Sequence, residues 1–218
     1  MSFLALLAKD VRREMRTKEA LQAGLVLVLL FALVDLFAYT TLAGDHASAA
    51  VALWTPLLFG AAAIAGRGFA AEADRGTLDL VRSAPVPVAW HGWSRTAVQA
   101  ALTAVLALLG LAVSGLLFGV PASGILVTAL LLGCAGLAVL AALASAVAAQ
   151  ARSRDILLPI LVVPLAAPLV QSGIAASTLA LAGASWARVQ PSLLFCAGYD
   201  LVVAGAAWLL WPVLLETE

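Results

Sequence analysis

Few side chains in this sequence of 218 residues have the types and spacing that catalysis or metal binding needs. There are two histidines, His46 and His91, and two cysteines, Cys134 and Cys196, and they form no C-x-x-C pair or other metal-ligand spacing. The sequence has no G-x-x-x-x-G-K-[ST] loop to hold nucleotide phosphates and no evident nucleophile with a matching base. We therefore expect that the chain is not an enzyme, that it holds no metal, and that any ATP hydrolysis belongs to another polypeptide.

Three polar residues lie inside long apolar stretches, where a charge is costly: Asp35, Gln171 and Asp200. No Lys or Arg accompanies the two acids there, so at least one acid is expected to be protonated or hydrated. Counting along the predicted spans places both acids in the outer halves. A role in a substrate route or a partner contact is one interpretation, and placement at the membrane interface is the other. The two acids lack the Gly-rich surroundings expected of an intramembrane protease.

The elements that must position these residues are membrane helices. The sequence is 64% hydrophobic and 11% charged, with a mean hydropathy of +1.07, whereas soluble domains carry about 25% charged residues. At about 20 residues per crossing, the length fits about six spans and leaves no room for a separate soluble domain. The predicted fold class is an all-α integral membrane bundle, a single domain over residues 1–218. The apolar runs lie at about 21–41, 47–66, 96–118, 123–149, 156–182 and 192–215.

Residues 1–19 predict an amphipathic helix that lies on the membrane surface, an elbow helix, before the first span. Its start mixes apolar and charged residues, so we expect no cleavable signal. One face carries basic residues and the other is apolar. The basic residues are Lys9, Arg12, Arg13 and Arg16, and the apolar ones are Leu4, Leu7, Ala8, Val11 and Met15.

The basic residues are distributed very unevenly among the predicted loops. Of the 12 Lys and Arg, 11 fall in residues 1–19 or in the loops on the same side, and Arg188 alone falls between spans five and six. The positive-inside rule then places that side, and with it both termini, in the cytoplasm. The six tryptophans mostly fall near span ends, which predicts an interfacial aromatic belt: Trp54, Trp90, Trp93, Trp186, Trp208 and Trp211. Small residues such as Gly133 and Gly136 predict closely packed spans.

The long polar insertion at residues 67–95 carries the functional signal. We predict a cytoplasmic hairpin of two short helices, the first ending at Arg75 and Gly76, and the second capped by Thr77 and ended by prolines. Its charges and its Leu78, Leu80 and Val81 would dock a partner protein. A rigid element between two spans is what an energy-coupling subunit needs. The alternative, an ordinary loop with solvated charges, stays open on composition alone.

These residues resemble the CcmB, or heme exporter B, family, the permease component of the bacterial cytochrome c maturation ABC complex. The family pattern is R-x-F, acidic residues, then D-G-[ST]-L-E before a Pro-containing stretch. A second matching stretch, Arg152 to Asp155, leads into a Leu- and Pro-rich fifth span. Gly66 and Arg75 depart from the pattern, because acidic residues are expected at both positions. The residues that stand at the positions of the pattern in the insertion are Arg67, Phe69, Glu72, Asp74, Arg75, Gly76, Thr77, Leu78 and Asp79, and those in the span are Pro159, Pro164 and Pro168.

The prolines of the fifth span each remove a backbone donor, so this span is expected to be kinked and to face protein. A bending element and a static kink are both consistent with that pattern.

The resemblance implies a multi-pass protein of the bacterial inner membrane whose residues 67–79 dock an ATPase. It implies a CcmA-like ATPase, a CcmC-like heme-handling membrane protein, a small CcmD-like membrane subunit and a CcmE-like heme chaperone as partners. ATP hydrolysis would then drive release of the heme-loaded chaperone. The alternative function is a general ABC exporter permease for a lipid, drug or polymer. A purely structural scaffold is disfavoured by the capped hairpin, no nucleic-acid partner is expected, and the sequence leaves a homodimer open.

Heme and ATP are expected on partner subunits and not on this chain. An axial heme ligand needs an available imidazole, and a single histidine is far more often a surface residue than a ligand. His46 falls in an outer loop and His91 in the cytoplasmic insertion.

Overall fold

A computed structural model describes residues 3–18, 22–31, 33, 45–66, 87–149 and 154–216. Five of its helices are long and apolar enough to cross a membrane, so the chain is a multi-pass, all-helical membrane protein. The predicted first span is described only in the shorter apolar helix Gln22–Phe31 and residue 33, so this span, and with it the count of six, stays a prediction. The other helices are α1 (Phe3–Thr17), α3 (His46–Gly66), α6 (Val88–Phe118), α7 (Gly124–Ala149), α8 (Arg154–Leu181) and α9 (Trp186–Glu216).

Two spans begin earlier than predicted. Helix α6 starts at Val88, so residues 88–95 belong to the helix and not to the polar insertion. Pro87 precedes it as the N-cap, with φ −54° and ψ 123°. The short helix that Pro85 and Pro87 are predicted to end lies outside the described residues. Helix α9 starts at Trp186, which places Arg188 within its first turn and not in a loop. Hydropathy underestimates both helices because their polar first turns extend beyond the apolar run.

The start of α3 and the end of α6 each carry a local capping signal. Asp45 precedes α3 and its Oδ1 accepts a hydrogen bond from the Ser48 N–H at 2.7 Å. Hydrogen bonding by Ser48, through its side chain first and its backbone N–H second, lowers the pKa of the Asp45 carboxyl. Helix α6 ends at Gly119, whose positive φ of 66° suits glycine and whose N–H donates to the Gly115 oxygen at 3.1 Å.

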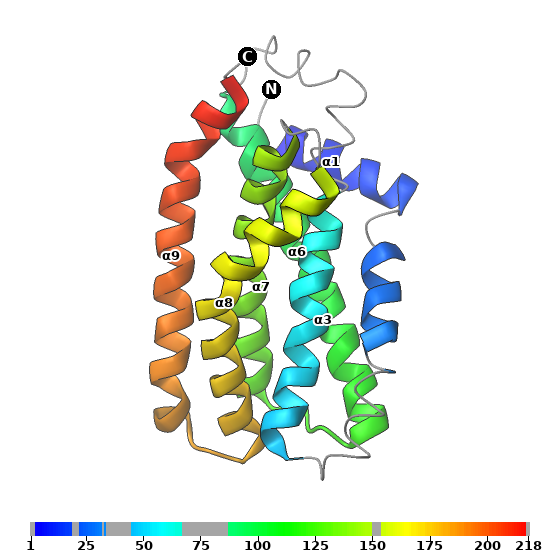
Figure 1. Cartoon of the computed structure of the whole chain (residues 1–218), viewed down its shortest axis with the longest axis vertical. Coiled ribbons are helices and arrows are strands. Elements are labelled where there is room, and N and C mark those ends of the chain that lie inside the picture. Colours follow the sequence, from blue (N-terminus) through cyan, green and yellow to red (C-terminus); the bar gives the residue numbers. More distant parts are fainter. Residues whose placement is uncertain are drawn as a thin grey trace.

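Helix α7 lies at the centre of the bundle and packs against α3, α6, α8 and α9 (Figure 1). Helix α1 lies across one end of the bundle and packs against α6 (Figure 1). The C-terminal ends of α3, α7 and α9 and the starts of α6 and α8 lie at this same end, which we call the α1 end. The chain therefore leaves α3 and enters α6 at the α1 end.

Helix α1 does not use its predicted apolar face to pack on the bundle. Leu4 and Met15 are 72% and 67% exposed, whereas Leu6 and Asp10 are buried against the bundle. An exposed apolar face is what a helix lying in the membrane surface would present to lipid. The surface placement itself stays a prediction.

Two of the tryptophans predicted for an interfacial belt lie in the core instead. Trp54 and Trp211 are both fully buried. The Trp54 ring contacts the backbones of Gly133 on α7 and Gly173 on α8, and its Nε1–H donates to Ser177 Oγ at 2.9 Å. Small residues on a helix surface leave space for a large neighbouring side chain. Such close packing matters in a membrane, because lipid supplies no hydrophobic driving force for helix association.

Helix α8 is bent, as Figure 1 shows, and it contains the three predicted prolines. Its buried stripe includes Leu158, Val162 and Leu169. Pro164 and Pro168 are exposed, so the helix faces protein through its leucine stripe and not through these prolines. Proline on the outer side of a helix is a recognised cause of bending.

The two cysteines give a direct check of the packing. Cys134 is 2% and Cys196 0% exposed. We expect neither to react with a water-soluble maleimide in the folded protein and both to react after denaturation in SDS. Ala122→Cys, exposed in the loop between α6 and α7, is the control that should react in both states. Labelling of Cys134 or Cys196 in the folded state would contradict the helix packing described here.

Candidate functional site

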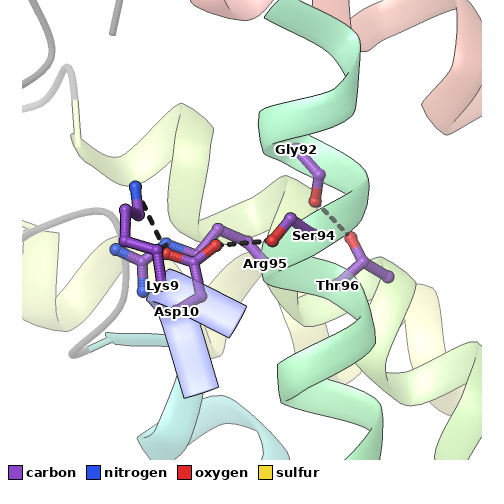
Figure 2. Close-up of polar contacts among 6 residues, drawn as sticks. All are labelled: Lys9, Asp10, Gly92, Ser94, Arg95 and Thr96. Atoms are coloured by element: carbon purple, nitrogen blue, oxygen red, sulfur yellow. Dashed lines mark hydrogen bonds and ion pairs between the residues drawn. The ribbon is translucent and has the colours of Figure 1, made fainter. Parts of the chain in front are cut away.

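The α1 end of the bundle holds a buried polar cluster that joins α1 to the start of α6 (Figure 2). Asp10 on α1 is 0% exposed. Its Oδ2 accepts a hydrogen bond from Ser94 Oγ at 2.6 Å. Its Oδ1 lies 3.4 Å from Lys9 Nζ and 3.9 Å from Arg95 Nε. We call these four residues the Asp10 cluster.

The Asp10 cluster stabilises a charge that would otherwise be costly. Removing a carboxylate from water costs several kcal/mol of hydration free energy. Only well-placed cations and hydrogen-bond donors offset that cost. Lys9 lies on α1 itself, but Arg95 and Ser94 come from α6, so this part of the compensation exists only while α1 and α6 are in contact. The neighbouring Thr96 hydroxyl is satisfied within α6 by the Gly92 oxygen at 2.9 Å (Figure 2). The cluster therefore fixes α1 to α6.

The start of α6 is also held from its other side by α9. A Cβ added to Gly92 would collide with the Trp211 ring, so the indole packs directly on the α6 backbone. His91, in the same turn, is 2% exposed. The expectation that His91 is a surface residue is therefore wrong, because α6 extends through this segment and turns His91 inward.

Helix α3 is fixed at the same end of the bundle. The Gln99 Nε2–H donates to the Ala61 oxygen at 2.8 Å, and Ser145 Oγ donates to the Ala65 oxygen at 2.6 Å. These bonds join the last turns of α3 to α6 and to α7. Gly66 and Pro87, which flank residues 67–86, thus both belong to rigid, mutually bonded helices. Any force applied to residues 67–86 would reach the bundle through these two attachments.

An apolar cavity of about 570 Å³ lies beside this region, between the helix Gln22–Phe31 and helices α3, α7 and α8. Its lining includes Leu27, Phe31, Phe59 and Leu158. The Ser145 hydroxyl in the lining is already bonded to Ala65. A cavity of this size and polarity suits a hydrophobic molecule or chain.

Asp200 lies away from this end, in the middle of α9. It is midway between Trp186 and Leu214, 14 residues from each, and so lies nearer the middle of the helix than the sequence count placed it; its depth in the membrane stays a prediction. The sequence predicted that this span begins at residue 192, whereas α9 begins at Trp186. Among the described residues, neither carboxylate oxygen has a hydrogen-bond partner. Gln171 is exposed on α8 and does not bond to Asp200.

The sequence of this chain is similar to that of a known membrane-protein family. The family described as CcmB protein matches residues 1–209 of this chain. The chain belongs to the CcmB family. A relative, the heme exporter protein B of Paracoccus denitrificans (strain Pd 1222), is 32% identical over 161 residues, which cover 71% of each protein. The resemblance inferred from the sequence motifs is thereby confirmed.

The residues that carry the CcmB resemblance in the insertion, from Arg67 to Asp79, lie outside the described residues. Asp35, Arg152 and Ser153 also lie outside them, and the side chains of Arg154 and Asp155 are not described. The predicted docking role of the insertion therefore stays a prediction. The structure describes the two helices from which this segment leaves the bundle.

Sequence reasoning missed the Asp10 cluster. Asp10 is an acid among basic residues, in the sequence KDVRR, and charge counting treated this stretch as uniformly basic. A usable signal was present: Phe3, Leu6 and Asp10 recur at helical spacing and so share a face. Because that face combines apolar residues with one acid, it indicates a packing surface that needs a cation or donor opposite.

Proposed function

We propose that this CcmB-family protein is the membrane permease subunit of an ABC complex of cytochrome c biogenesis. In this proposal it lies in the bacterial inner membrane with both termini in the cytoplasm, and it is not itself catalytic. ATP hydrolysis by a CcmA-like partner is coupled to release of the heme-loaded, CcmE-like chaperone. The family match over residues 1–209 and the 32% identity to a heme exporter protein B support this role.

The observation that carries the coupling role is the Asp10 cluster. Helix α6 continues directly from residues 67–86, and Asp10 bonds its start to α1. A push or pull on the segment by an ATPase would move α6 and α1 as one unit, because separating them breaks the Ser94 hydrogen bond and the Arg95 ion pair of Asp10. Rigid attachments of this kind transmit work, whereas a solvated loop would absorb it.

The acidic residues of the segment give the test of ATPase docking. We expect Glu72→Ala, Asp74→Ala and Asp79→Ala in one protein to reduce ATPase recruitment to membranes by about tenfold or more, because opposite charges at an interface contribute about 1.4 kcal/mol or more in total. Recruitment is measured by co-sedimentation of the ATPase with membranes, together with ATP turnover. Asp45→Ala, an acid at the far end of the bundle, is the matched control and should leave both unchanged. Unchanged recruitment and turnover in the triple variant would rule out the segment as the docking element.

A second candidate function, a general exporter permease for a hydrophobic substrate, has one observation in its favour, the apolar cavity beside α3 and α8. Co-purification separates the two functions. The cytochrome c role requires the ATPase together with a CcmC-like heme-handling membrane protein, whereas the exporter role requires the ATPase alone.

A further inference from the structure

Asp200 lies at the middle of a helix that is long and apolar enough to cross a membrane. It is 14 residues from each end of the span Trp186–Leu214, which is about 21 Å at the helical rise of about 1.5 Å per residue. Its contact Gly136 on α7 lies 12 residues after Gly124 and 13 before Ala149, so both helices place this contact at mid-span. The hydrocarbon layer is about 30 Å thick, and the carboxyl therefore lies near its centre.

The carboxyl of Asp200 is enclosed by α7, α8 and α9. A Cβ on Gly136 would collide with its Oδ1 and would lie 2.7 Å from Leu169 Cδ2, so the carboxyl fills the space that glycine leaves. Both carboxylate oxygens are buried and have no hydrogen-bond partner among the described residues. The carboxyl of Asp200 therefore fits between the helices because residue 136 of α7 is a glycine.

The titratable groups that face Asp200 are Cys134 from α7 and Cys196 and Tyr199 from α9, while α8 contributes Leu169. None of them is a cation. The Tyr199 hydroxyl donates to the Leu165 oxygen, and Cys196 Sγ lies 4.0 Å from the Leu169 oxygen. No Lys or Arg occurs in the sequence between Arg188 and the C-terminus. An ionised Asp200 would thus have neither counter-ion nor donor in this packing.

We propose that Asp200 is a proton-binding site at the centre of the membrane. The carboxyl carries its proton while α7, α8 and α9 are packed around it, because a neutral acid costs far less to bury than an uncompensated carboxylate. When the helices part enough to admit water, the O–H bond breaks, the proton passes to that water, and the electron pair stays on the carboxylate. Protonation of Asp200 therefore reports, and stabilises, the packed arrangement. This inference does not depend on the proposed partner ATPase.

Infrared spectroscopy of the full chain in lipid nanodiscs at neutral pH tests the proposal. We expect the spectrum of wild type minus Asp200→Asn to show the C=O stretching band of one protonated carboxylic acid and no loss of carboxylate bands. The matched control is Asp45→Asn, since hydrogen bonds from the Ser48 side chain and backbone N–H lower the pKa of that exposed carboxyl. Its difference spectrum should show carboxylate bands only. A carboxylate signal in the Asp200 difference spectrum would overturn the proposal.

A second measurement needs no substitution at Asp200 and so does not depend on how the variant folds. A hydrophobic carbodiimide reacts with protonated carboxyls: the acid O–H adds across one C=N bond, and the adduct rearranges to an N-acylurea that retains all atoms of both reactants. We expect peptide mass spectrometry of the wild-type protein to find Asp200 modified and Asp45 unmodified. Modification of Asp45 without Asp200, or of neither, would count against a protonated carboxyl at this site.

Discussion

Alanine at Gly133 is expected to destabilise the folded bundle by about 1 to 3 kcal/mol, the usual cost of forcing extra atoms into a packed core. The new methyl group would collide with the ring of Trp54, and that ring is fully buried and held by the Ser177 hydroxyl. Gly173→Ala would press on the same ring from α8. Because the two substitutions share Trp54, their combined effect is expected to differ from the sum of the single effects.

The measurement is thermal stability of the full chain in detergent, followed by the loss of the monodisperse size-exclusion peak on heating. Gly205→Ala is the control, since a Cβ there meets nothing within 4 Å and alanine favours the helix by up to about 1 kcal/mol. Trp54→Leu removes the ring atoms that clash, so it should relieve part of the cost of Gly133→Ala. Equal stability of the Gly133→Ala and Gly205→Ala proteins would mean that the ring does not lie where the structure places it.

Asp10→Ala is expected to release α1 from α6. Removing one partner of a buried ion pair typically costs about 3 to 5 kcal/mol, and the lower end applies here because Lys9 is partly exposed. Ser94→Ala should cost less, about 1 to 3 kcal/mol, since it removes the hydrogen bond to Asp10 and leaves the ion pairs in place. Helix α1 should then detach while α3, α7, α8 and α9 remain packed, because the hydrogen bond and ion pairs of Asp10 join it to α6 and to Lys9 of α1 itself.

Cysteine accessibility at two positions of α1 measures this release. Leu6 is buried against the bundle, so Leu6→Cys should be protected from a water-soluble maleimide in the parent and become reactive when Asp10→Ala is added. Arg12→Cys, on the exposed face, should react in both backgrounds. The native cysteines are buried and give a low background. Continued protection of Leu6→Cys in the Asp10→Ala protein would show that apolar packing alone holds α1 in place.

The same variant connects the fold to the proposed function. If α1 and α6 move as one unit under force from residues 67–86, Asp10→Ala should leave ATPase recruitment intact and reduce the coupling of ATP turnover to chaperone release. Recruitment of the ATPase tests the docking segment, whereas coupling of ATP turnover to chaperone release tests the attachment of α1 to α6. The two readouts separate a failure of the docking segment from a failure of the Asp10 cluster.

The sequence by itself determined that this protein lies in a membrane, and it determined the approximate positions of the five long helices that the structure describes. Apolar runs report directly that a segment can lie in lipid, so α3, α7 and α8 begin and end within a few residues of their predicted bounds. Two motifs in polar segments were enough to indicate the CcmB family, which the match over residues 1–209 confirms. Predicted starts were wrong for α6 and α9, because polar first turns do not register as apolar spans.

Only the tertiary structure decided which faces of these helices meet. A membrane helix is apolar all round, so its sequence carries no periodic signal that separates a lipid-facing side from a packed side. Trp54 therefore read as an interfacial residue until Gly133 and Gly173 were seen to enclose it. Asp10 read as one charge in a basic helix until Ser94 and Arg95, more than 80 residues later in the chain, were found beside it. Composition reports the surrounding solvent, whereas contacts between distant residues follow from close packing, which depends on shape and on hydrogen-bond geometry in three dimensions.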